Sequence, residues 1–66
     1  MSWFIARERA GEYQQLKFTS IFESQCEFGT EGVPLFFRKK DDAETRMQEE
    51  QDKDPDWEYS VNEFLR

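Results

Sequence analysis

The chain contains no histidine, so it lacks both the commonest general base and the commonest metal ligand of proteins. Its single cysteine, Cys26, can form no disulfide within the chain and has no histidine to activate it as a nucleophile. No apolar run approaches the roughly 18 residues that span a bilayer, and Arg7 interrupts the first apolar stretch before the core of a signal peptide develops. We therefore expect a non-enzymatic protein of the cytoplasm, without a cofactor, a metal site or a membrane contact.

With 66 residues the sequence has room for one small domain, residues 1–66, with a thin core. A chain of this length buries only about 60% of the surface that its unfolded form exposes. Aromatic residues are plentiful by contrast, with seven Phe, two Trp and two Tyr. Each ring can bury about 150–250 Å² of surface, so we expect a few side chains to do much of the packing.

The net charge of −6 is confined to one part of the sequence. Residues 40–66 hold ten acids and four bases, whereas residues 1–39 hold five of each. An acidic surface repels phosphate backbones and attracts basic partners. We therefore expect no direct binding of nucleic acid, and a larger protein with a basic surface as the partner. The alternative is that the charge only keeps the domain soluble, as it does in many small proteins.

The N-terminal part has the pattern of a β-hairpin followed by a further strand. Residues 3–9 alternate with period two, Ala10-Gly11 supplies a turn, and a second strand is predicted over residues 12–19. Residues 20–28 fit either a helix that starts with a capping box or a strand. We favour a short turn followed by a strand to the end of that stretch.

The middle of the chain predicts one more strand and a helix. Residues 33–38 have a strand pattern, and Pro34, which has no N–H to donate, suits the start or the edge of such a strand. A helix is predicted over residues 41–51, and its first residue, an aspartate, is the predicted N-cap. Ala43 and Met47, four residues apart, are its only apolar stripe, so the helix is expected to lie on the sheet through a narrow contact.

The C-terminal part predicts a last strand. Residues 54–56 have turn chemistry and end the helix, and residues 57–61 then alternate. We therefore predict an α+β fold, with a small antiparallel sheet of about four strands and one short helix packed on one face. The predicted order is β-β-β-β-α-β or β-β-β-α-β.

The stretch "DKDPDWEYSVNE" has the acid spacing of a calcium-binding EF-hand loop. Asp52, Asp54, Asp56 and Glu63 occupy its first, third, fifth and twelfth positions. The sixth position needs a small residue because the chain turns sharply around the ion, and Trp57 stands there instead. We therefore predict that the protein does not bind calcium.

The same acids are better explained as a surface that docks on a protein partner. The candidate partner-binding residues lie in the predicted helix and in the loop and strand that follow it, within residues 41–58. They are Asp42, Glu49, Glu50, Asp52, Asp54, Asp56 and Glu58.

A second candidate function, from another class, is self-association. Trp3 and Phe4 point to opposite faces of one predicted strand, and Phe36 and Phe37 do so on another. A sheet with one thin helix is expected to leave some of this aromatic surface uncovered, as a partner site or a homodimer interface. The alternative is that the tail, residues 64–65, folds back over it.

Three stretches together resemble a known class of proteins: "WFIARERAGEYQQLKF", then "LFFRKKDDAETRMQEE", then "WEYSVNEFL". They resemble small phage-encoded proteins that begin with a glycine-centred hairpin and later enter a helix through Phe, basic residues, an acid and Ala. The resemblance implies no catalytic residues. It implies a role as an inhibitor of host defence or of host enzymes, and several such proteins are acidic enough to imitate nucleic acid. The residues that carry it are Ile5, Gly11, Tyr13, Phe37, Asp42 and Ala43.

Overall fold

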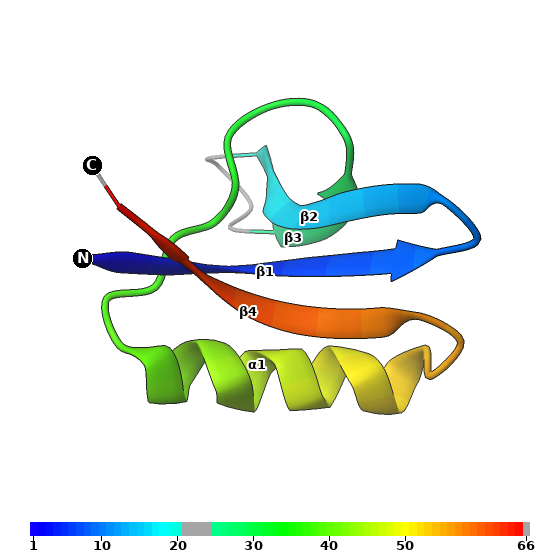
Figure 1. The fold of residues 1–66 in the computed structure, drawn as a ribbon. Helices are drawn as coiled ribbons and strands as arrows, with labels where there is room; N and C mark the ends of the chain where they lie inside the picture. Colours follow the sequence, from blue (N-terminus) through cyan, green and yellow to red (C-terminus); the bar gives the residue numbers. More distant parts are fainter. Residues whose placement is uncertain (21–24, 66) are drawn as a thin grey trace.

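The computed structural model describes residues 1–20 and 25–65, and in it four strands form one antiparallel sheet with a helix across a single face (Figure 1). The strands pair in the order β3-β2-β1-β4, so the C-terminal strand lies at an edge. The elements are β1 (Ser2–Arg9), β2 (Glu12–Ser20), β3 (Gln25–Gly29), α1 (Lys40–Lys53) and β4 (Glu58–Phe64). The predicted α+β fold is confirmed, and the order is β-β-β-α-β. The predicted turn before β3 falls on residues 21–24, outside the described ranges.

A two-residue turn joins β1 to β2, as the sequence predicts. Ala10 and Gly11 both have positive φ, 49° and 84°, which is the signature of a type I′ turn. Such a turn twists in the same sense as the strands that it connects, and it places Arg9 opposite Glu12. Glycine adopts a positive φ freely, whereas the Cβ of Ala10 makes the same conformation cost about 1–2 kcal/mol.

The connection before the helix enters the sheet where β1 and β2 separate. β1 pairs with β2 only over its last four residues. Before them, the main chain of Trp3 exchanges hydrogen bonds of 2.9 and 2.8 Å with Phe37, and the N–H of Leu35 donates to the carbonyl of Leu16 at 2.8 Å. The predicted strand over residues 33–38 is therefore present only as two single bridges, because the segment pairs with a different strand on each side.

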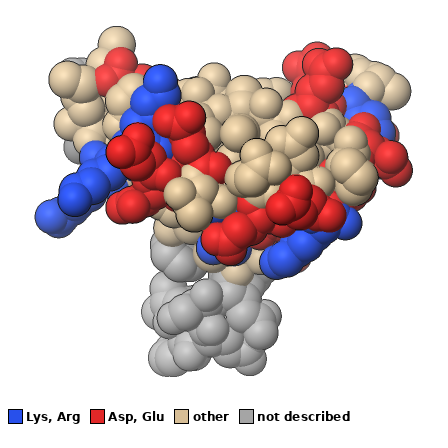
Figure 2. All heavy atoms as spheres, turned by 90° about the horizontal axis from the view of Figure 1, so that it is seen from below, with Lys and Arg blue, Asp and Glu red and all other residues tan. Residues whose placement is uncertain are grey.

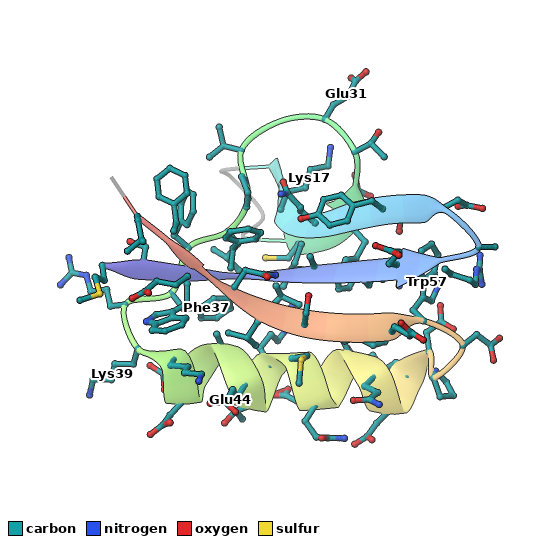
Figure 3. The ribbon with its side chains drawn as sticks, viewed as in Figure 1. Lys17, Glu31, Phe37, Lys39, Glu44 and Trp57 are labelled. Atoms are coloured by element: carbon teal, nitrogen blue, oxygen red, sulfur yellow. The ribbon has the colours of Figure 1, made fainter. Side chains whose placement is uncertain are left out.

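The core lies between α1 and one face of the sheet. Ile5 and Leu16 from the sheet and Ala43 from the helix are fully buried at its centre. Burying a side chain such as Ile5 contributes about 1.5–3 kcal/mol. The small side chain of Ala43 lets the helix approach the sheet closely, and Met47 packs one turn further on, so the predicted apolar stripe is confirmed. Figure 3 shows Phe37 in this layer between sheet and helix. The other partly buried side chains that complete the core are Trp3, Cys26, Phe28, Leu35 and Val61.

The start of α1 differs from the prediction. Lys39 is the N-cap residue, and its side chain makes no capping hydrogen bond. The prediction of Asp41 as the N-cap is wrong, because this residue lies in the first turn with Asp42. There a carboxylate stabilises the helix through the positive end of its dipole instead. At the other end the N–H of Asp54 donates to the carbonyl of Glu50 at 3.0 Å and closes the last turn.

Candidate functional site

The exposed side of α1 carries five carboxylates. Ala43 is buried and faces the sheet. An α-helix turns by about 100° per residue, so side chains that are rotated by about 90° or more from Ala43 around the helix axis point to solvent. Figure 2 views the molecule from this side, and Figure 3 shows one of the five, Glu44, pointing away from the sheet. These exposed residues are named the outer acidic face, and they are Asp41, Asp42, Glu44, Glu49 and Asp52.

The sequence prediction found part of this face. Asp42, Glu49 and Asp52 are three of the seven predicted site residues, and all three are exposed. Asp41 and Glu44 were missed, although both are exposed as well. The signal that identifies them is the helical period counted from the apolar stripe, which places both on the solvent side.

Glu50, another predicted site residue, lies on the inner edge of the helix. It follows Ala43 by seven residues, which is close to two turns, and therefore has nearly the same orientation. Its Oε1 lies 3.0 Å from Nε of Arg46 and 3.9 Å from Nζ of Lys53, and only 15% of its side chain is exposed. Burial lowers the pKa of Arg46, but the hydrogen bond and charge of Glu50, together with a smaller contribution from Cys26, raise that pKa above its ordinary value. Two of the three bases of α1 thus converge on Glu50.

Asp54, at the end of α1, is held by Arg7 from β1. Nη1 of Arg7 lies 3.6 Å from Oδ2 of Asp54, and Nε donates to Oε1 of Gln14 at 2.8 Å. The guanidinium also lies over two rings, 4.0 Å from the centroid of Phe28 and 4.1 Å from that of Trp57. Only 16% of the Arg7 side chain is exposed. Asp54 therefore helps to anchor the helix to the sheet, and its charge is partly neutralised.

The remaining predicted residues, Asp56 and Glu58, form a second acidic group at the hairpin end of the sheet. Glu58 lies opposite Glu8 in the pairing of β1 with β4, where like charges repel. Together with Arg9 and Ala10 these three acids line a shallow hollow of about 300 Å³. The seven predicted residues thus divide into exposed helix acids, paired acids and a separate group beside the hairpin.

A basic cluster borders the outer acidic face at the start of the helix. Arg38, Lys39 and Lys40 are all exposed, and Nζ of Lys40 lies 5.5 Å from the ring centroid of Trp3. Figure 2 shows acidic and basic atoms interspersed on this side of the molecule. A partner that docks here must therefore place its bases opposite the helix itself.

The four acids with EF-hand spacing do not converge on one point. Asp52 lies on the outer acidic face, and Asp54 pairs with Arg7. Glu63 stands opposite Trp3 towards the other end of β4. Within residues 1–20 and 25–65, no group of three acidic or cysteine side chains is placed to hold a metal ion. That the protein binds no calcium stays a prediction.

Comparison of the chain with models of known protein families, with curated proteins and with solved structures finds no match. The resemblance to small phage-encoded proteins therefore rests on the residues quoted for it alone. In the described part of the chain, no helix has the length and apolar character needed to cross a membrane.

Proposed function

We propose that the chain is a non-enzymatic protein-binding protein that docks its outer acidic face on a basic surface of a larger protein. The observation that supports this proposal most strongly is the pairing within α1. Arg46 and Lys53 both turn to Glu50, and among the residues that the structure describes no base lies within ion-pair distance of the five outer carboxylates. The charges of these carboxylates therefore remain available to a partner.

The position of two of these acids opposes the stability of the helix. Asp52 stands in the last turn of α1 and Glu49 just before it, near the partial negative charge of the helix C-terminus. An acid in the last turn costs about 0.3–1 kcal/mol, whereas a lysine there would stabilise the helix. Acids in the first turn, such as Asp41 and Asp42, would provide solubility without that cost. A binding role explains why acids extend along the whole helix.

The spacing of the charges supports a nucleic-acid-binding site as the surface on which the helix docks. Asp41 and Asp52 are eleven positions apart, which is about 16 Å along the helix axis at 1.5 Å per residue. Five charges on that length are about 4 Å apart along the axis. One strand of a nucleic acid carries a charge about every 3.4 Å, which is a similar spacing. A groove lined with Lys and Arg for phosphates would meet carboxylates at a similar spacing.

The resemblance to small phage-encoded proteins supports the finer part of the proposal. In this proposal the chain is an inhibitor encoded by a phage or a mobile element, and it acts in the cytoplasm. It occupies the nucleic-acid site of a host protein, such as a component of a defence system. Asp56 and Glu58, beyond the C-terminal end of α1, extend the docking surface towards the hairpin.

A neutralised variant of the outer acidic face tests the proposal. It carries Glu44→Gln, Glu49→Gln and Asp52→Asn, and because all three side chains are exposed, each change is expected to alter stability by no more than about 0.5 kcal/mol. The wild-type chain and the variant serve as bait in a lysate of the native host, and mass spectrometry identifies the proteins retained. We expect the variant to lose the specific partner that the wild type retains.

The matched control carries Glu12→Gln, Glu27→Gln and Glu31→Gln. It has the same net charge as the test variant, but its three exposed side chains lie outside α1. We expect it to retain the partner, because the proposal depends on where the charge lies and not on its total. If both variants retain the partner equally well, the outer acidic face is not the docking site.

A further inference from the structure

The face of the sheet opposite α1 carries an aromatic cluster at one end. Strand pairing places Phe4 and Phe64 on this face, and the connection that enters the sheet adds Phe36. The ring centroid of Phe36 lies 6.3 Å from that of Phe4 and 5.0 Å from that of Phe64. α1 packs on the other face, against β1 and β4 (Figure 1). The cluster is therefore not covered by the helix.

Apolar side chains around this cluster are exposed to solvent. Of the predicted tail, residues 64–65, Phe64 packs against Phe36, but Leu65 is 71% exposed and Val33 is exposed to the same extent, so the tail leaves part of the apolar surface uncovered. Monomeric proteins rarely leave contiguous apolar patches larger than a few hundred Å² uncovered. The exposed side chains are named the open apolar patch, and they are Met1, Val33, Phe36, Phe64 and Leu65.

We propose that the open apolar patch is the interface of a homodimer, in which two copies of the chain pack sheet to sheet. A two-fold interface needs a hollow and a protruding side chain on the same patch, because the patch meets itself. In this proposal Leu65, which is 71% exposed, serves as the protruding side chain, and Phe64 lines both a hollow of about 460 Å³ and a smaller one that Leu65 also lines. In the dimer, Leu65 of each copy enters the larger hollow of the other. The larger hollow is lined by Ser2, Gly32, Val33, Pro34, Phe36 and Phe64.

The distribution of charge permits two copies with a net charge of −6 each to meet at this face. The open apolar patch contains no charged side chain, and strand pairing turns Glu63 to the helix side together with Trp3. Facing sheets pack about 10 Å apart, and each helix lies about 10 Å beyond its own sheet. The two helix axes would then lie about 30 Å apart, with the outer acidic faces on their far sides, and this separation is several Debye lengths of about 8 Å.

The size of the face determines the expected strength of the dimer. The molecule measures 28 × 25 × 21 Å, and the open apolar patch occupies only one end of one face. The interface is therefore expected to bury less than about 1,200 Å² in total, which is the range of weak and transient complexes. We expect micromolar affinity, with a monomer in dilute solution and a dimer at high concentration.

Sedimentation velocity over a range from about 1 µM to about 500 µM tests the proposal. The mass of the wild-type species is expected to rise from 8.0 kDa towards twice that value. Leu65→Asp and Val33→Asp are each expected to keep the protein monomeric over the whole range. Both side chains are 71% exposed in the monomer, so circular dichroism spectra should match that of the wild type.

Gln48→Asp is the matched control, because it adds the same charge at an exposed position on α1, on the other side of the sheet. We expect this variant to dimerise like the wild type. Raising the salt concentration should leave the dimer intact or strengthen it, because salt screens the repulsion between two acidic copies. A wild-type mass of 8.0 kDa at every concentration would overturn the proposal. Equal dimerisation by Leu65→Asp and Gln48→Asp would do the same.

Discussion

Replacing Arg7 by lysine keeps a positive charge between the sheet and the end of α1 but removes the planar guanidinium. In the wild type that group contacts the rings of Phe28 and Trp57 at 4.0 and 4.1 Å and donates to Gln14 at 2.8 Å. Lysine can still approach Asp54 as a point charge, but it cannot stack flat on two rings or hold this hydrogen-bond geometry.

The expected loss follows from these contacts. A largely buried hydrogen bond from a charged group contributes about 1.5 kcal/mol or more, and each cation–π contact contributes at least about 0.5–1 kcal/mol. A lysine at this position still makes part of the cation–π contacts. We therefore expect Arg7→Lys to lower the free energy of unfolding by about 2 kcal/mol. For a domain of this size that corresponds to a fall in Tm of about 8–16 °C.

Thermal unfolding followed by near-ultraviolet circular dichroism measures this change through the aromatic side chains, which include Trp57 in the contact itself. Arg9→Lys is the matched control, because Arg9 also lies 4.1 Å over Trp57 but is exposed. We expect it to shift Tm by only a few degrees. Equal shifts for Arg7→Lys and Arg9→Lys would refute the view that the buried guanidinium joins the two layers.

Three further substitutions test the fold. Ala10→Asn is expected to raise the free energy of unfolding by about 1 kcal/mol in urea titrations, because asparagine tolerates a positive φ; a loss of stability would contradict the turn type. Tyr59→Phe removes a hydroxyl that donates to the carbonyl of Asp54 at 2.7 Å, so stability should fall by about 1 kcal/mol. Amide exchange at the end of α1 should then quicken, and unchanged exchange would count against that role. Ala43→Leu is expected to cost about 1–3 kcal/mol because the site is fully buried, and a higher Tm would show that the helix does not pack closely there.

Local patterns predicted most of the fold. The hairpin followed from period-two alternation on either side of Ala10-Gly11, and the helix from good helix formers with an apolar stripe at Ala43 and Met47. The last strand followed from alternation after Trp57. Each of these depends on residues only a few positions apart, which is where sequence patterns are most informative.

Long-range pairing could not be predicted from these patterns. Residues 33–38 have a strand pattern, but they form only two single bridges, one to β1 and one to β2. This outcome depends on the point at which β1 and β2 separate. The pairing of Asp54 with Arg7 joins residues 47 positions apart, and no local signal announces it. The inward position of Glu50 is different, because the helical period counted from Ala43 already implied it.

The salt dependence of partner affinity tests the role of the outer acidic face most directly. Calorimetry would compare the wild type with the variant that carries Glu44→Gln, Glu49→Gln and Asp52→Asn, using the partner that the wild type retains. We expect the wild-type Kd to rise about tenfold between salt concentrations of about 0.05 M and 0.3 M. The variant should bind about tenfold more weakly at low salt and respond less to added salt. An identical Kd for both proteins, unchanged by salt, would contradict docking through these carboxylates.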